Sequence, residues 1–257
     1  MHRDLIVQFT RRELQVRHKG SRLGHLWGLI SPLMMLGLYL FIFGLVFGGK
    51  FGVLENENFY DFAIALFLGL SLFNVIAESI TIAPTLIVNQ PNFVKKVVFP
   101  LEIIPLSKTL AALYYSLLSI AVCIALAPFG HGGLTLRVIE FPLLIIPLYM
   151  TALGITLTFS ALGVFVRDIN HITGFAATAL MYASAIVYPP SRVPHSLWKF
   201  LRINPLPILV DQARSLILWN KDINLYELAY VYIISFFILI AGYFIFRRLR
   251  PYFSELL

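Results

Sequence analysis

Six apolar stretches, each close to the length that crosses a lipid bilayer, dominate the sequence. A membrane-spanning helix needs roughly 20 consecutive apolar residues. The stretches lie at about 30–48, 59–83, 106–128, 141–165, 172–189 and 228–246. Of the 257 residues, 59% are hydrophobic and 13% are charged, which is more apolar surface than one soluble core of this length can bury. The sequence therefore predicts an all-α integral membrane protein with six transmembrane helices.

The Lys and Arg residues indicate which side of the membrane each loop faces. If the N-terminus is cytoplasmic, the inside carries Arg3, Arg11, Arg12, Arg17, Lys19, Arg22, Lys95, Lys96, Lys108, Arg167, Arg247, Arg248 and Arg250. The short outer loops then hold only Lys50 and Arg137, as the positive-inside rule requires. We therefore expect both termini in the cytoplasm. The net charge of +7 then reflects topology and attraction to anionic lipid, and does not indicate a nucleic-acid partner.

Two segments on the cytoplasmic side have the pattern of short amphipathic helices. Residues 3–17 mix apolar side chains with Arg and Glu at helical spacing, which predicts a helix lying in the membrane interface. Residues 89–100, NQPNFVKKVVFP, begin with residues typical of a helix start and carry Phe93 and Val97 one turn apart. We expect the second segment to form a short cytoplasmic helix.

The longest outer segment, residues 190–227, is too apolar for a solvated loop. Pro205, Pro207, Asp211 and Arg214 break it into pieces that are too short to cross a bilayer. It is therefore predicted to form two short helices that dip into the outer leaflet. Irregular backbone at that depth is tolerated only where protein or a water-filled cavity covers it.

The sequence contains no recognisable reaction chemistry. Residues 44–50, GLVFGGK, match the start of a phosphate-binding loop, but Phe51 replaces the Ser or Thr that would hold magnesium. A membrane-embedded glycosyl or acyl transferase would need a base or metal ligand near one membrane surface, whereas His131, His171 and His195 are predicted on both sides. We therefore expect no enzyme activity, no metal site and no cofactor on this chain.

Two features inside the apolar windows leave alternatives open. Glu78 lies in the second window, where a charge is costly and often functional, unless this helix tilts or ends early and leaves Glu78 at the cytoplasmic interface. Gly44 and Gly48, with Gly37 seven residues before Gly44, allow close approach of another helix or ordinary packing within the chain.

Four motifs in this order resemble the permease subunit of polysaccharide-exporting ATP-binding-cassette (ABC) transporters. They are RHKGSRLGHLWGLISPLMMLGLYLFIFGLVFG at 17–48, NQPNFVKKVVFPLEIIP at 89–105, FVRDINHI at 165–172 and NPLPILVDQAR at 204–214. The resemblance covers the whole chain and is strongest to O-antigen and teichoic acid exporters. One departure is His18, where the family commonly has an aromatic residue.

The resemblance implies a homodimer in the bacterial inner membrane, with two separate ATPase subunits that bind ATP and magnesium on the cytoplasmic side. The cargo would be a lipid-linked polysaccharide, such as O-antigen on an undecaprenyl diphosphate carrier, moved to the periplasm through a channel at the dimer interface. Teichoic acid, capsular polysaccharide, a drug or a small lipid remain alternative cargoes. The single transmembrane domain, 1–257, would comprise 1–24 (interfacial helix and turn), 25–189 (five spans and coupling helix), 190–227 (periplasmic gate helices) and 228–257 (sixth span and tail).

For such a cargo, the basic junction before the first span is predicted to form the lipid gate that receives the carrier diphosphate. The gate residues are Arg17, His18, Lys19, Ser21, Arg22, Gly24 and Trp27. The alternative is that the basic residues serve only topology and attraction to the lipid surface. Aromatic residues are predicted to line the channel, because they support the apolar faces of sugar rings; otherwise they face lipid. They are Tyr39, Phe43, Phe47, Tyr182 and Tyr188.

Two further sets of residues complete the predicted site. Coupling to the ATPase is assigned to Asn92, Phe93, Lys95, Lys96 and Val97 in the short cytoplasmic helix, unless this helix is an unbound interfacial one. The periplasmic gate is assigned to Trp198, Pro205, Leu209, Asp211 and Arg214.

Overall fold

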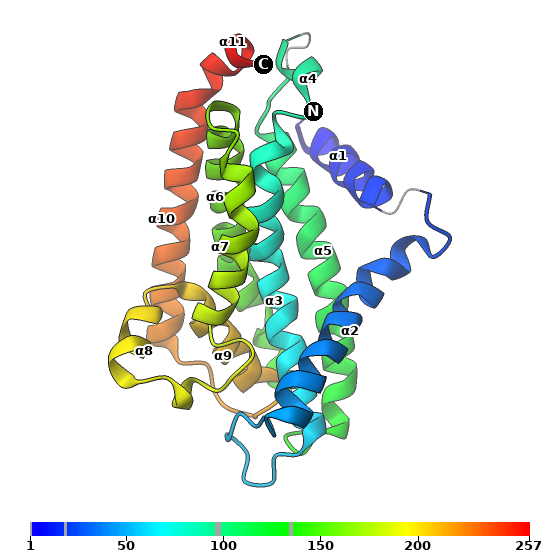
Figure 1. The fold of residues 1–257 in the computed structure, drawn as a ribbon, viewed down its shortest axis with the longest axis vertical. Coiled ribbons are helices and arrows are strands. Elements are labelled where there is room, and N and C mark those ends of the chain that lie inside the picture. Colours follow the sequence, from blue (N-terminus) through cyan, green and yellow to red (C-terminus); the bar gives the residue numbers. More distant parts are fainter. Residues whose placement is uncertain (1, 18–19, 96–98, 134–135) are drawn as a thin grey trace.

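The computed structural model describes residues 2–17, 20–95, 99–133 and 136–257, and the regular elements within these ranges are all helical. Most of the long helices run side by side, and the first of them runs obliquely to the others (Figure 1). They are α2 (Trp27–Tyr39), continued by the π-helical segment η2 (Leu40–Val46), α3 (Phe59–Leu86), α5 (Ile103–Leu126), α6 (Pro142–Phe165), α7 (Ile169–Ala183) and α10 (Leu225–Leu249). Short 3-10 turns are η1 (Gly24–Leu26), η3 (Ala127–Phe129), η4 (Leu136–Glu140), η5 (Pro190–Arg192) and η6 (Arg250–Tyr252).

Within the described residues, five helical stretches are long and apolar enough to cross a membrane. They are Trp27–Val46, Phe59–Leu86, Ile103–Phe129, Leu136–Phe165 and Leu225–Leu256. These correspond to five of the six predicted windows. The exception is the window at 172–189, where α7 has only 15 residues, or about 22 Å of helix against a hydrocarbon core of about 30 Å. Helix geometry stops near Ala185, whose φ of 50° lies in the left-handed region, and two prolines follow at 189 and 190.

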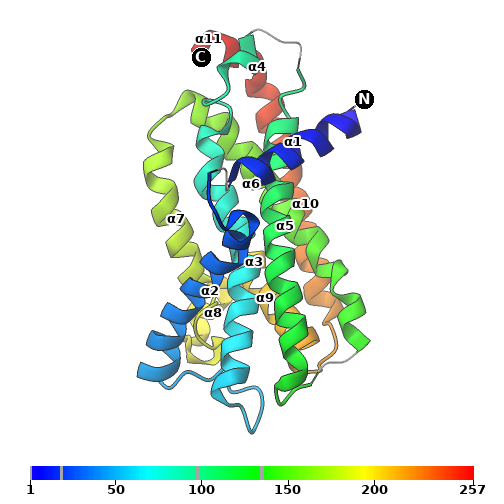
Figure 2. The same ribbon diagram turned by 90° about the vertical axis from the view of Figure 1, so that its right-hand side faces the viewer.

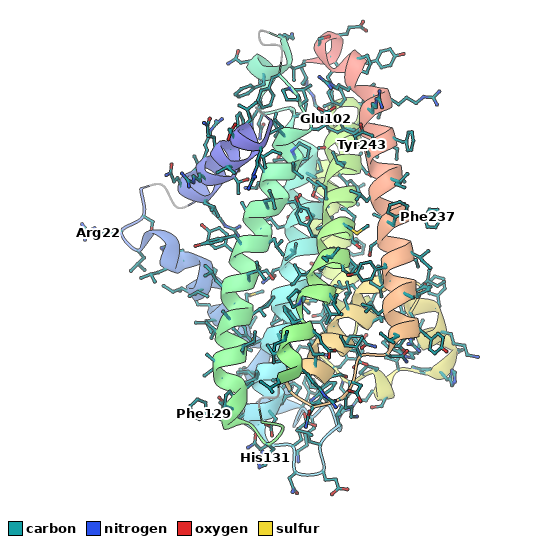
Figure 3. All side chains as sticks on the ribbon, turned by 180° about the vertical axis from the view of Figure 1, so that it is seen from behind. Arg22, Glu102, Phe129, His131, Phe237 and Tyr243 are labelled. Atoms are coloured by element: carbon teal, nitrogen blue, oxygen red, sulfur yellow. The ribbon has the colours of Figure 1, made fainter. Side chains whose placement is uncertain are left out.

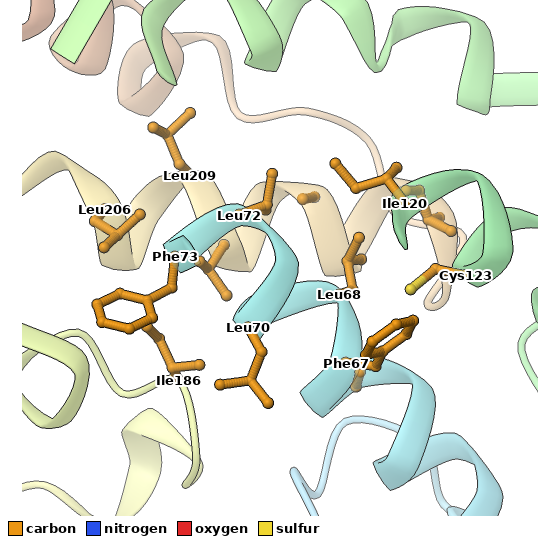
Figure 4. Packing of buried hydrophobic residues seen from close by; sticks show 14 of the residues in the cluster. Phe67, Leu68, Leu70, Leu72, Phe73, Ile120, Cys123, Ile186, Leu206 and Leu209 are labelled. Carbon is orange, nitrogen blue, oxygen red and sulfur yellow. The ribbon is translucent and has the colours of Figure 1, made fainter. Parts of the chain in front are cut away.

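Helix α3 is the centre of the bundle. It begins at a capping box, in which the Asn58 side chain accepts from the Asp61 N–H and the Asp61 side chain accepts from the Asn58 N–H. Its buried face packs against Ile120 and Cys123 of α5 and against α9, as Figure 4 shows. Of its apolar window, 78% is buried within the protein. A helix enclosed in this way serves as the scaffold on which the other elements are positioned.

Glycines decide how closely several helices approach. A Cβ on Gly242 of α10 would lie 2.2 Å from the carbonyl oxygen of Gly154 on α6, so only glycine fits at this crossing. A Cβ on Gly44 would lie 2.5 Å from the Phe59 ring of α3, whereas Gly48 has a φ of 59° and lies in a turn. Gly44 therefore serves packing within the chain, which is one of the two roles that the sequence left open.

Different short helices lie at the two ends of the bundle. Both chain termini lie at one end, together with α4 (Pro91–Lys95) and α11 (Phe253–Leu256) (Figure 1). At the opposite end lie α8 (His195–Leu201) and α9 (Pro205–Ile217). Helix α1 (His2–Arg17) crosses the bundle at an angle to the long helices (Figure 2). The segments predicted at 3–17 and 190–227 thus form the expected short helices, while α4 is shorter than the predicted 89–100.

Candidate functional site

A cavity of about 500 Å³ lies between the α1–α2 junction and the helices α3 and α5. Its wall combines a guanidinium, a carboxylate and several hydroxyl and amide groups with apolar surface. The polar and charged lining residues are Arg17, Ser31, Ser71, Asn74, Glu78, Thr81, Tyr115, Ser116 and Ser119. An enclosure of this kind, beside a helix of membrane-spanning length, suits a ligand with a polar head.

The last residue of α1, Arg17, is bound to Glu78 of α3. Arg17 Nη1 lies 2.9 Å and 2.7 Å from the two carboxylate oxygens of Glu78. The guanidinium carbon also lies 4.5 Å from the centre of the Tyr115 ring, which is cation–π geometry. The Tyr115 hydroxyl donates to the Leu14 carbonyl over 3.3 Å. These contacts hold the C-terminal end of α1 against α3 and α5.

Lys108 of α5 extends this ion pair into a row of alternating charges. Its Nζ lies 3.2 Å from Glu13 Oε2 and 3.9 Å from Glu78 Oε1. The row Glu13, Lys108, Glu78, Arg17 has no net formal charge, and the Glu78 side chain is only 13% exposed. The sequence predicted a positive charge at Arg17, and the structure adds that a carboxylate 61 residues away pairs with it.

Sequence reasoning placed none of Glu13, Glu78 and Lys108 in this site. A usable signal was present, since Glu78 lies inside an apolar window and Lys108 lies at the start of the next one. Charges at such positions usually pair with one another or line a polar cavity. Pairing the two by this rule would have brought α3 and α5 together at the site.

The predicted turn after α1 is present among the described residues. Gly24, with a φ of 49°, donates its N–H to the Ser21 carbonyl over 3.3 Å. Trp27 begins α2 and lines the cavity, whereas the Arg22 side chain extends away from the helices (Figure 3). The predicted gate residues His18 and Lys19 lie outside the described residues. Of the predicted gate set, the structure thus brings Arg17 and Trp27 to the cavity wall.

The aromatic residues of the first span share one face, as their spacing predicts. The ring centroids of Tyr39 and Phe43 are 6.1 Å apart, and those of Phe43 and Phe47 are 6.0 Å apart. Phe43, Phe47 and Tyr188 line a second cavity of about 140 Å³. Tyr188 donates its hydroxyl to the carbonyl of Tyr182, whose own side chain is exposed. Phe43, Phe47 and Tyr188 therefore form one aromatic surface between η2 and the segment after α7. Tyr39 is buried instead, and its hydroxyl donates to the Met181 sulfur over 3.3 Å.

Phe93, the apolar side chain of the predicted coupling helix, packs within the chain. Its ring centroid is 5.5 Å from that of Phe9 on α1 and 4.9 Å from that of Phe99. Asn92 and Lys95 of α4 are exposed. The remaining predicted coupling residues, Lys96 and Val97, lie outside the described residues. We call Phe9, Phe93 and Phe99 the aromatic cluster, and it links α4 to α1.

Among the predicted periplasmic gate residues, Arg214 is fully buried. Its Nε donates to the Ala65 carbonyl over 2.9 Å and its Nη2 donates to the Ile186 carbonyl over 2.7 Å. The guanidinium carbon lies 4.1 Å from the Phe51 ring centre, and the absence of a side chain at Gly69 leaves room for it. Burial lowers the pKa of Arg214 to about 10, so the group stays protonated at neutral pH.

The other four gate residues divide between core and surface. Pro205 and Leu209 are buried on α9, which begins at the side-chain cap of Asn204. Trp198 of α8 is half-buried, and Asp211 is exposed. Helix α9 is therefore anchored in the bundle along one face, while α8 lies at the edge of the molecule (Figure 1).

Comparison with known proteins places the whole arrangement among membrane transporters. The family model described as ABC-2 type transporter matches residues 4–218, which run from within α1 to just after α9. The O-antigen export system permease protein RfbA of Klebsiella pneumoniae is 29% identical over 255 residues, covering 99% of this chain and 95% of its own length. The RfbA protein of Myxococcus xanthus is 25% identical over 256 residues with the same coverage. The polysialic acid transport protein KpsM of Escherichia coli is 26% identical over 242 residues, covering 90% of this chain and 89% of its own.

Proposed function

Because the chain belongs to the ABC-2 type transporter family, we propose that it is the membrane permease of an ATP-driven exporter of lipid-linked polysaccharide. The family assigned from the four sequence motifs is confirmed by the match over residues 4–218. Near-full-length similarity to O-antigen export permeases supports a polysaccharide cargo, and the similarity to KpsM supports a related polymer as the alternative. The observation that carries the proposal is the polar cavity at the α1–α2 junction.

The proposed topology has six crossings. Helix α6 ends near α11, since Phe165 and Phe253 have ring centroids 6.3 Å apart. Helix α10 begins at the opposite end, where Tyr230 donates to the Ile203 carbonyl beside α8. This arrangement supports one further crossing between α6 and α10, made by α7 and the irregular segment after it. Arg214 satisfies a carbonyl in that segment, as irregular backbone at membrane depth requires.

The proposed lipid gate is the α1–α2 junction with its cavity. We propose that Arg17, Lys19 and Arg22 attract the diphosphate of an undecaprenyl carrier at the cytoplasmic leaflet. The hydroxyl groups of the cavity would donate hydrogen bonds to the phosphate oxygens. The carrier's hydrocarbon tail stays in the bilayer beside α2. Both termini and α4 would then face the cytoplasm, in agreement with the positive-inside rule.

The proposed channel forms between two copies of the chain. Only 6% of the apolar window over Trp27–Val46 is buried within one copy, so this helix has a large surface available for a partner. The aromatic surface of Phe43, Phe47 and Tyr188 lies at the end of this helix. Aromatic rings can support the apolar faces of successive sugars without fixed hydrogen bonds, which allows a polymer to slide.

Energy would come from two separate ATPase subunits that hold ATP and magnesium. Helix α4 is the proposed docking element, and the aromatic cluster connects it to α1. A displacement of α4 would then reach the lipid gate through Phe93 and Phe9, because close-packed side chains have low compressibility and transmit strain to one another. The helices α8 and α9 are proposed to dip into the outer leaflet and close the channel at rest.

The test of this function is the triple Arg17→Gln, Lys19→Gln, Arg22→Gln variant, scored for surface polysaccharide, membrane insertion and ATPase activity of the assembled complex. We expect export to fall by more than tenfold, since each charge-assisted bond contributes about 1.5–3 kcal/mol and roughly 1.4 kcal/mol equals one decade. Insertion and basal ATP hydrolysis should persist. The matched control neutralises Arg3, Arg11 and Arg12, which lie on α1 as Arg17 does but do not line the cavity.

If the control variant exports normally and the triple Gln variant does not, the lipid gate is supported. Normal export by the triple Gln variant contradicts it. Loss of membrane insertion in the triple Gln variant alone would mean that these charges serve topology instead.

A further inference from the structure

We propose that Glu78 selects for a diphosphate headgroup by occupying Arg17 until a ligand of higher charge displaces it. This inference rests on the proposed lipid gate and adds Glu78 to it. A carboxylate would not be expected in a site that binds anions. The Arg17–Glu78 pair lines the 500 Å³ cavity, so a headgroup entering there meets both partners at once.

The geometry makes Glu78 a competitor for the same donors. A single guanidinium nitrogen, Arg17 Nη1, reaches both carboxylate oxygens, at 2.9 Å and 2.7 Å. Phosphate oxygens bind guanidinium groups by the same charge-assisted hydrogen bonds. With 33% of the Arg17 side chain exposed, an incoming anion can reach the guanidinium, but it gains only the difference between its own interaction and that of the carboxylate.

Charge then separates two classes of lipid. An ordinary phospholipid headgroup presents one phosphodiester with a single negative charge, the same as the Glu78 carboxylate. Replacing Glu78 on Arg17 therefore gives this headgroup little net free energy, and the displaced carboxylate repels it. A diphosphate diester carries two negative charges and more acceptor oxygens. Its stronger attraction to Arg17 can therefore outweigh the repulsion from the displaced Glu78 carboxylate. Without Glu78, abundant anionic phospholipids would fill a basic site at headgroup depth.

The structure also supplies a destination for the displaced carboxylate. Lys108 Nζ lies 3.9 Å from Glu78 Oε1 and is held by Glu13 of α1 at 3.2 Å. A small rotation brings Glu78 fully onto Lys108, where it competes with Glu13. Occupation of the cavity by a diphosphate therefore weakens the hold of α5 on α1, and couples binding to movement of the interfacial helix.

The experiment compares two ligands that differ by one phosphoryl group. Undecaprenyl phosphoryl-glucose has one phosphodiester, and undecaprenyl diphosphoryl-glucose has a diphosphate diester with the same sugar and tail. Binding of each is measured to the complete permease–ATPase complex in nanodiscs. The variants are Glu78→Gln, Arg17→Gln and, as matched control, Glu13→Gln, which removes an equal charge from the same row but leaves the Arg17–Glu78 contact intact.

We expect the wild-type complex to bind the diphosphate ligand more tightly than the monophosphoryl ligand. Glu78→Gln should reduce this ratio of affinities about tenfold, equivalent to roughly 1.4 kcal/mol, because the monophosphoryl ligand then binds more tightly. Glu13→Gln should change the preference less than about twofold, as expected of a partly solvated pair. An unchanged preference in Glu78→Gln overturns the inference, and so does loss of both ligands from a folded Glu78→Gln complex, because Glu78 then only positions Arg17.

Two further readouts keep the outcome decisive. If Glu78→Gln does not assemble, Glu78→Asp keeps the charge but shortens the side chain, and its preference should lie below that of the wild type; an unaltered value counts against the inference. Arg17→Gln tests the underlying function. If it leaves binding of both ligands unchanged, the lipid gate itself is wrong, whereas loss of binding in Arg17→Gln with no effect of Glu78→Gln refutes only the selectivity role.

Discussion

Replacing Arg214 by Met should destabilise the end of the bundle that holds α8 and α9 more than any single surface substitution. Methionine has similar length but no donor, so it leaves the buried Ala65 and Ile186 carbonyls without the bonds of 2.9 Å and 2.7 Å that Arg214 provides. Hydrogen bonds from a charged group contribute about 1.5–3 kcal/mol each. Relief of the cost of burying the guanidinium offsets part of the loss. The expected decrease in unfolding free energy is about 3–5 kcal/mol.

The assay is thermal unfolding of the purified complex, in which we expect the Tm to fall by roughly 10 °C. The matched control is Arg137→Met at the same end of the molecule. Arg137 pairs with Asp222 over 2.9 Å, but the Asp222 side chain is 85% exposed, so this change should cost less than about 1 kcal/mol. Equal Tm values for the two variants would refute the claim that Arg214 secures the irregular segment after α7.

Three further predictions concern movement and packing. Phe93→Asp should disrupt the aromatic cluster and abolish export, measured together with ATPase pull-down; full assembly and export would contradict coupling through α4. In a cysteine-free background, Cys at Trp198 should react with external thiol reagents at rest, whereas Cys at the buried Leu209 should react only in the nucleotide-bound complex; identical labelling in both states argues against a gate. Gly242→Val should separate α10 from α6 and lower the yield of folded protein, while Gly174→Val, which meets no neighbour, should not.

The sequence alone determined the class of protein and most of its helices. Hydropathy averaged over about 20 residues located five spans, because each lies in a long apolar run. In a membrane, the backbone N–H and C=O groups of such a run are satisfied within the segment only if it is helical. The short helices at 3–17 and 190–227 were also predictable, since proline, charge and helical spacing are local properties. The four motifs identified the family without any structural information.

The tertiary structure alone decided which of these residues meet. Hydropathy could not place the end of α7 at Ala183, since the apolar run continues beyond the point at which the backbone leaves the helical conformation. Nor could it pair Arg17 with Glu78, because that contact joins residues 61 positions apart and exists only when α1 crosses α3 and α5. Charge patterning along a sequence gives the sign of each group, but the free energy of a site depends on distances between groups. Here those distances place Arg17 of the basic segment in a row of charges with no net formal charge.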